Sequence, residues 1–183
     1  VGETNMAKAL YRKYRSKSLD EVIGQKHVTD ILARAIAAGN TSHAYLLTGP
    51  RGVGKTSVAR ILACEINKLP YNEDDSHIDI IEIDAASNNG VEDVRDLREK
   101  VQIAPVSAAK KVYIIDEVHM LSKAAFNALL KTLEEPPEHI VFILATTDVD
   151  KLPATIISRT QRYGFRAITI EDAISHMRYI ADE

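Results

Sequence analysis

One stretch of eight residues constrains the fold more than any other part of the sequence: Gly49-Pro50-Arg51-Gly52-Val53-Gly54-Lys55-Thr56. It fits the P-loop pattern G-x-x-x-x-G-K-[ST]. The apolar run 44–47 just before it is short enough for a buried strand, and apolar residues at helical spacing follow it, at Val58, Ile61, Leu62 and Ile66. A strand, a glycine-rich turn and a helix in this order bind anions, because the backbone N–H groups of the turn and the positive end of the helix point at a phosphate. The stretch therefore predicts that the chain binds a nucleoside triphosphate.

The side chains of this loop have separate expected roles. Lys55 can reach the β- and γ-phosphates, and the Thr56 hydroxyl can bind Mg²⁺. We expect nucleotide contacts from the loop and the first helical turn, at Arg51, Gly52, Val53, Gly54, Lys55, Thr56 and Ser57. Guanine-selective P-loop proteins usually carry an Asn-Lys-x-Asp box late in the chain. The one Asn-Lys pair, Asn67-Lys68, comes early and continues as Leu-Pro, so ATP is favoured over GTP.

Two acids follow the apolar run 112–115, and they indicate that the chain hydrolyses the nucleotide as well as binding it. Asp116 is expected to hold Mg²⁺, and Glu117 is expected to orient and polarise an attacking water. The alternative, a pair of surface acids, is less favoured because a P-loop precedes them in an α/β pattern. His119 completes an Asp-Glu-Val-His box of the kind seen in helicases, but 183 residues leave no room for a second motor domain.

Two further side chains are candidates for catalysis. Thr147 follows the apolar strand 140–145 and is expected to contact the γ-phosphate or the attacking water, with Thr146 as the alternative. Arg159 follows a short predicted helix, 155–158, from which it can reach the nucleotide of a neighbouring subunit. An arginine finger of this kind is worth about 10³–10⁵ in rate.

The order of the elements predicts an α/β fold. Five apolar runs read as strands and alternate with helices, at 44–47, 78–83, 112–115, 140–145 and 163–166. Such strands imply a parallel five-stranded sheet with helices on both faces. The length of 183 residues suits one domain, and the last helix, from Thr169, is expected to open a further one.

Composition excludes several classes of function. The net charge of −3 gives no overall attraction to nucleic acid, so any contact with DNA needs a local patch. One cysteine, Cys64, excludes an internal disulfide and suits a reducing cytoplasm, where we expect the protein to reside. The six histidines lack metal-ligand spacing, so no zinc is predicted, and no run is long enough to span a membrane.

Several motifs together resemble a known family. The P-loop, the stretches 81–91 (Ile-Glu-Ile-Asp-Ala-Ala-Ser-Asn-Asn-Gly-Val), 111–121 (Lys-Val-Tyr-Ile-Ile-Asp-Glu-Val-His-Met-Leu) and 126–139, and the run 142–159 are similar to the tau/gamma subunits of bacterial DNA polymerase III. That family is the AAA+ motor of the sliding-clamp loader. The resemblance extends from about Tyr11 to Phe165, and its combination of motifs is far more specific than the P-loop alone.

The resemblance implies an ATP-driven hetero-pentamer that opens the sliding clamp and places it on primed DNA. Its partners would be the other loader subunits, the clamp and primer-template DNA. Lys55 and Thr56 match Walker A, Asp116 and Glu117 match Walker B, Thr147 matches sensor 1, and Arg159 matches the finger that acts in trans. The implied adenine pocket is formed by Tyr11, Arg15, Val22 and Ile23, and the turn at Asn88-Asn89 is a candidate DNA contact.

By the same resemblance, residues 6–166 form the AAA+ nucleotide-binding core and residues 167–183 begin a lid domain. Residues 1–5 precede Met6, a plausible native start, and are expected to be a cloning remnant. The chain alone is expected to be a monomer with very slow turnover, because its finger acts on a neighbour.

Three departures from the family pattern are visible. The four-cysteine zinc module is shortened to the cysteine-free segment 68–77, and Thr160 and Ser16 stand where the family has a cysteine and a proline. Arg159 itself is kept, so its expected role stands. The alternatives are a nucleotide-gated AAA+ scaffold that does not hydrolyse ATP and a different AAA+ DNA-processing motor, such as a branch-migration motor.

Overall fold

The computed structural model describes residues 14–72 and 76–182, and its centre is a parallel five-stranded sheet. The strands lie in the order β2-β3-β4-β1-β5 and pair only in parallel. Their bounds are β1 Ala44–Thr48, β2 Ile80–Asp84, β3 Lys111–Asp116, β4 Ile140–Thr146 and β5 Gln161–Gly164. The predicted sheet is therefore confirmed, and β4 lies at its middle.

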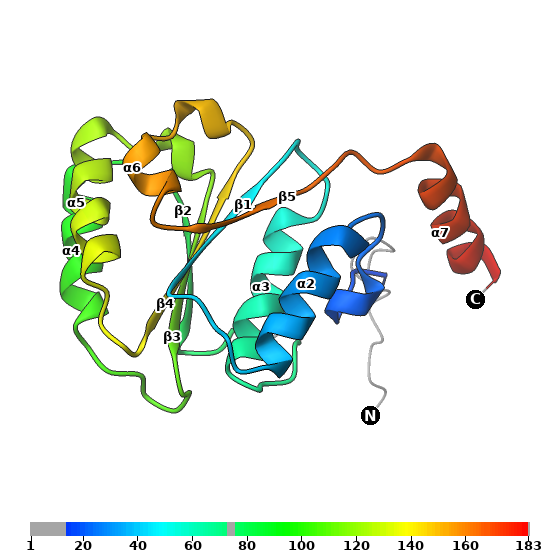
Figure 1. Cartoon of the computed structure of the whole chain (residues 1–183), viewed down its shortest axis with the longest axis horizontal. Helices are drawn as coiled ribbons and strands as arrows, with labels where there is room; N and C mark the ends of the chain where they lie inside the picture. Colours follow the sequence, from blue (N-terminus) through cyan, green and yellow to red (C-terminus); the bar gives the residue numbers. More distant parts are fainter. Residues whose placement is uncertain (1–13, 73–75, 183) are drawn as a thin grey trace, which may run out of the picture.

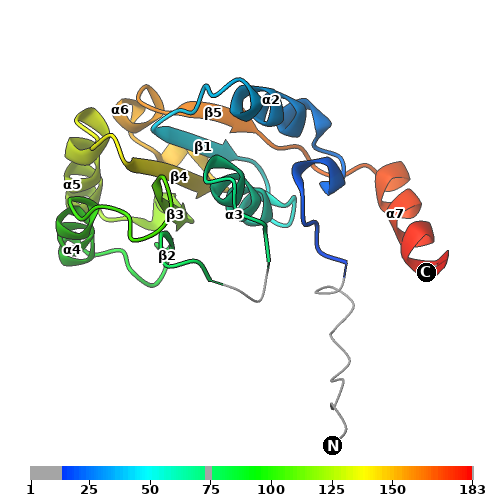
Figure 2. The ribbon, with the colours of Figure 1, turned by 90° about the horizontal axis from the view of Figure 1, so that it is seen from below.

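Helices cover both faces of this sheet, as the sequence predicts (Figures 1 and 2). One face carries η1, α2 and α3, and the other carries α4, α5 and α6. The helical elements are η1 Leu19–Glu21, α2 Lys26–Ala37, α3 Lys55–Ile66, α4 Val91–Val101, η2 Val118–Met120, α5 Lys123–Glu134, η3 Val149–Lys151, α6 Ala154–Ile157 and α7 Ile170–Asp182. Ser122 caps α5, because its Oγ accepts the Ala125 N–H at 3.2 Å.

Side chains of the central strand β4 alternate between two hydrophobic clusters. Phe142 and Leu144 pack with α4 and α5, whereas Ile143 and Ala145 pack with α2 and α3. All four are 0% exposed, and burying a large apolar side chain contributes about 1.5–3 kcal/mol. The unbroken apolar run from Ile140 to Ala145 is therefore what a sheet covered on both faces requires.

The last strand differs from its prediction by two residues. β5 covers Gln161–Gly164 instead of 163–166, because it pairs with β1 in the register Tyr45 to Gln161 and Thr48 to Gly164. Its side chains are half-buried or exposed, as suits the edge of a sheet. The apolar pattern therefore marks the existence of this edge strand but not its ends.

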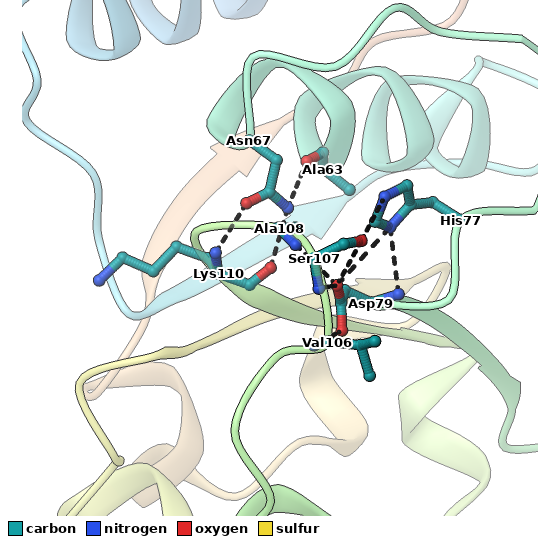
Figure 3. A network of polar contacts seen from close by, with 8 residues as sticks. All are labelled: Ala63, Asn67, His77, Asp79, Val106, Ser107, Ala108 and Lys110. Carbon is teal, nitrogen blue, oxygen red and sulfur yellow. Dashed lines mark hydrogen bonds and ion pairs between the residues drawn. The ribbon is translucent and has the colours of Figure 1, made fainter.

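A buried carboxylate, Asp79, organises the loop that leads into β3 (Figure 3). Its oxygens accept the backbone N–H groups of Val106, Ser107 and Ala108 at 2.7, 2.8 and 2.8 Å. Burial alone would raise the pKa of the Asp79 carboxyl, but these hydrogen bonds outweigh it and lower that pKa to about 2. Asp79 thus holds the start of β3 against the start of β2.

Helix α7 follows β5 through the segment 165–169 and lies at the far end of the molecule, beyond α2 (Figure 1). It belongs to neither hydrophobic cluster, and Ile170, Met177 and Tyr179 are exposed. Among the described residues, no helix is long and apolar enough to cross a membrane.

Candidate nucleotide-binding site

The P-loop connects β1 to α3 at the carboxyl edge of the sheet. Gly49, at its start, has φ 144°, and a Cβ there would lie 2.6 Å from the Phe165 carbonyl oxygen. Gly54, at its end, has φ 95° and precedes the first residue of α3. L side chains rarely adopt these conformations, so the glycines permit both the turn and the close approach of β5's continuation. The helix N-terminus thus faces the end of the sheet as phosphate binding requires.

Lys55 is the first residue of α3, and only 7% of its surface is exposed. Its Nζ donates to the carbonyl oxygens of Gly49 and Pro50 at 2.8 and 2.6 Å. Burial lowers the pKa of the Lys55 ammonium, and the carboxylates of Glu117 and Asp116 partly oppose that shift. The lysine therefore lies inside the loop, close to both acids.

Thr56 and Asp116 come together from α3 and β3. Thr56 Oγ1 donates to Asp116 Oδ2 at 2.7 Å, although the two residues are 60 positions apart. A hydroxyl and a carboxylate are ligands that Mg²⁺ uses together with substrate phosphates and water. The two side chains thus fit the predicted metal site. No group of three or more His, Cys, Asp or Glu that could hold a metal occurs within residues 14–72 and 76–182, and the absence of zinc stays a prediction.

Glu117 follows Asp116 in an unusual conformation. Its φ of 48° and ψ of 42° are left-handed, which costs a residue with a Cβ about 1–2 kcal/mol. Backbone strain of this kind is concentrated at functional sites. Thr147 Oγ1, from the tip of β4, donates to Glu117 Oε2 at 3.2 Å. The structure therefore brings together four of the five predicted catalytic residues, namely Lys55, Asp116, Glu117 and Thr147.

Thr146 and His119 also belong to this cluster. The sequence indicated Thr146 only as the alternative to Thr147, and it gave His119 no catalytic role. Thr146, the last residue of β4, is 0% exposed. His119, in η2, places its Nδ1 at 2.9 Å from Thr146 Oγ1. The Asp-Glu-Val-His box and the Thr146-Thr147 pair were the sequence signals for this contact.

Two of the residues predicted to bind the nucleotide base lie against the P-loop and the first turn of α3. Arg15 Nε donates to Ser57 Oγ at 3.2 Å, and Val22, 7% exposed, lies next to Gly54. Val22 and Ile23 line a cavity of about 540 Å³ that α7 also lines. Tyr11 lies outside the described residues. In the loop itself, Arg51 and Gly52 are exposed, whereas Val53 is 5% exposed.

Arg159 contacts elements on the other face of the sheet. Its Nη2 lies 2.8 Å from Glu134 Oε1 at the end of α5, and its Nη1 donates to the Thr155 carbonyl at 3.0 Å. Within the described part of the chain, these contacts thus link Arg159 to α5 and α6, away from the P-loop of the same chain. Sequence patterns gave no sign of the partner Glu134.

Comparison with known proteins relates the chain to DNA polymerase III. The sequence model of the family described as "DNA polymerase III, delta subunit" matches residues 24–169. The DNA polymerase III subunit tau of Bacillus subtilis (strain 168) is 53% identical over 188 aligned positions, which cover 95% of this chain and 33% of that protein. The chain thus spans about a third of the length of tau and gamma/tau subunits such as those of Bacillus subtilis and Escherichia coli.

Solved structures of two proteins have folds similar to that of this chain. A gamma subunit-related protein of DNA polymerase III from Thermotoga maritima has a TM-score of 0.63 at 28% identity, over 76% of this chain and 47% of that one. The Thermotoga maritima RuvB Holliday junction branch migration motor has a TM-score of 0.65 at 27% identity, over 90% of this chain and 55% of its own. The AAA+ type of the P-loop fold and the resemblance to tau/gamma subunits are both confirmed. The chain belongs to the DNA polymerase III subunit family whose model it matches, and within that family it is similar to the tau subunits.

Proposed function

We propose that this chain is the ATP-binding and ATP-hydrolysing module of a replicative sliding-clamp loader. The observation that carries the proposal is the contact of 2.7 Å between Thr56 Oγ1 and Asp116 Oδ2, which joins the P-loop helix to the acid pair of β3. Relatives named tau and gamma/tau, at 50–53% identity, support the assignment to the loader.

In this proposal each residue acts on the triphosphate from the position it has in the fold. The P-loop N–H groups and Lys55 bind the phosphates, and Thr56 and Asp116 hold Mg²⁺. When bound, Mg²⁺ neutralises charge on the phosphate oxygens. Glu117 orients the attacking water and accepts its proton, and Thr147 contacts the γ-phosphate or that water.

Arg159 acts in trans, on the nucleotide of a neighbouring subunit. In support, its contacts with Glu134 and Thr155 hold it on the face of the sheet away from its own P-loop. The full assembly is a hetero-pentamer with other loader subunits, and it opens the clamp and loads it onto primer-template DNA. Asn88 and Asn89, exposed before α4, are the proposed contacts with the DNA phosphates.

The proposed domain division places the nucleotide-binding core at residues 6–166 and the start of the lid at residues 167–183. The position of α7 supports it, because this helix packs into neither hydrophobic cluster of the sheet. The cavity between Val22, Ile23 and α7 is then the place of the adenine base.

A different DNA-processing motor is the main alternative. The likeness to the RuvB branch migration motor favours it, but at 27% identity against 53% for the Bacillus subtilis tau subunit. A scaffold that binds ATP without hydrolysis is disfavoured because Glu117 and Thr147 face each other beside the metal site.

The test is a Glu117→Gln variant of the intact subunit, assembled with its partner subunits. We expect ATP affinity within threefold of the wild type and a fall in kcat of at least about 100-fold, the usual contribution of a general base. Clamp loading stops while ATP stays bound. Glu138→Gln, an exposed glutamate before β4, is the matched control and hydrolyses ATP normally. Hydrolysis at the wild-type rate by Glu117→Gln would contradict the role of Glu117, and normal clamp loading by that variant would contradict the loader.

A further inference from the structure

A buried polar link joins the ends of β3 and β4 beside the proposed water-orienting residue. His119 Nδ1 lies 2.9 Å from Thr146 Oγ1 and 3.4 Å from Glu117 Oε2, and the His119 side chain is 9% exposed. Its other ring nitrogen, Nε2, has no hydrogen-bond partner within residues 14–72 and 76–182. One nitrogen of the ring thus faces both β4 and Glu117.

Thr146 is a fixed end of this link. It is 0% exposed, pairs with Thr48 of β1, and its carbonyl oxygen accepts the Gly49 N–H at 3.3 Å. Its Oγ1 also accepts the Asp148 N–H at 3.0 Å. Thr146 is therefore anchored at the point where the P-loop begins.

At the other end of this link lies Glu117, whose side chain is less restrained than that of Thr146. Its side chain is 34% exposed, and its backbone is left-handed, so no helix or strand directs the carboxylate. Both contacts that hold it fall on one oxygen, Oε2, from Thr147 Oγ1 at 3.2 Å and from His119 Nδ1. The other oxygen, Oε1, has no hydrogen-bond partner in the described part of the chain, which leaves it to face a reacting water.

We propose that His119 is a positioning residue that orients the Glu117 carboxylate and ties it to β4 through Thr146. This rests on the proposed ATPase function. With the ring proton on Nδ1, the imidazole donates to Thr146 Oγ1 and turns its positive N–H edge toward Glu117 Oε2, 3.4 Å from Nδ1. With the proton on Nε2, Nδ1 turns a lone pair toward a carboxylate, which is repulsive. The Nδ1–H tautomer therefore attracts Glu117 through Oε2 and keeps that oxygen beside Thr146 of β4.

The assignment predicts which substitution retains the link. Asparagine places its amide N–H near the position of Nδ1, whereas glutamine places it near Nε2, where no described residue bonds. The test measures kcat and KM for ATP, and the Kd of a non-hydrolysable ATP analogue, for the assembled subunit carrying His119→Ala, His119→Asn or His119→Gln. His139→Asn is the matched control, because His139 bonds the Val101 carbonyl through its ring at the other end of β4.

We expect His119→Ala and His119→Gln to lower kcat by about tenfold to a hundredfold, the effect of a misplaced catalytic group, with KM and Kd within twofold. His119→Asn retains kcat within about threefold, as an N–H at the Nδ1 position requires. An unchanged kcat in His119→Ala, or equal losses in all three variants, would overturn the role of His119 alone. A wild-type assembly without ATPase activity would overturn the proposed function together with it.

Discussion

At the scale of single residues, the P-loop depends on a backbone position that only glycine fills. Gly49 has φ 144°, and its hydrogen faces the Phe165 carbonyl at a distance that excludes a methyl group. Gly39 also has a positive φ, 71°, but nothing described lies within 4 Å of a Cβ there. Alanine at Gly39 would therefore lose stability through backbone strain alone, whereas alanine at Gly49 would add a steric clash with Phe165.

We expect Gly39→Ala to lower the free energy of unfolding by about 1–2 kcal/mol, from the left-handed backbone alone. Gly49→Ala lowers it further, because two backbone segments must separate, and it also weakens ATP binding. Urea unfolding and ATP titration of both variants provide the measurement. Equal losses of stability in the two variants would show that the close contact between Gly49 and Phe165 does not restrict the side chain at position 49.

The predicted site residues that the structure brings together are those of short-range motifs. Lys55 and Thr56 belong to one pattern and Asp116 and Glu117 to another, and the parallel sheet brings the two together at its carboxyl edge. The contact of His119 with Thr146 was not predicted, because the two residues are 27 positions apart. The contact depends on the rotamer of the His119 side chain, and apolar periodicity carries no information about that rotamer.

At the scale of elements, the pattern of apolar runs alternating with helices predicted all five strands and the parallel sheet, because the three inner strands, β3, β4 and β1, are buried on both faces. It failed at the edges. β5 is polar and half-exposed, so its ends follow from pairing with β1. The role of Asp79 was also missed, because the apolar pattern placed it inside a predicted strand at 78–83, whereas β2 begins at Ile80 and Asp79 is 0% exposed before it.

The Asp79 network predicts a dependence of stability on pH. The folded-state pKa of about 2 lies below the ordinary value of 3.8, so the ionised carboxylate stabilises the fold above about pH 4. This contribution is lost as the pH falls from about 4 to about 2. Asp79→Asn should lower the free energy of unfolding by about 1–3 kcal/mol at pH 7, because it leaves buried N–H groups poorly paired.

Denaturant unfolding from pH 7 to pH 2.5 measures the effect, and the difference between wild type and Asp79→Asn shrinks within that acid range. Asp93→Asn is the control, because Asp93 accepts one backbone N–H, from Gly90, at the exposed start of α4. A difference that stays constant down to pH 2.5 would mean that the Asp79 carboxylate is not the group that titrates.

At the scale of the whole molecule, Arg159 contacts α5 and α6, which cover the face of the sheet opposite to α3, and in the proposed assembly it therefore acts on a neighbour's nucleotide. We expect Arg159→Ala to leave ATP affinity unchanged and to lower the ATPase rate of the assembly by about 10³–10⁵. Arg34→Ala, an exposed arginine on α2, is the control. Assemblies that mix Arg159→Ala with Lys55→Met subunits regain activity, because each variant supplies what the other lacks; absence of this recovery would contradict action in trans.

The central claim is that a triphosphate binds at the P-loop through Lys55, and a calorimetric titration with ATP and Mg²⁺ tests it most directly. Lys55→Met removes the ammonium but keeps the length of the side chain. Lys111→Met is the matched control, since Lys111 is 9% exposed and donates to the Lys100 carbonyl at the other end of the sheet. Loss of a charged hydrogen bond costs about 1.5–3 kcal/mol, so we predict that Lys55→Met weakens ATP binding at least about tenfold while Lys111→Met binds as the wild type does. Wild-type affinity in a folded Lys55→Met protein would contradict the account.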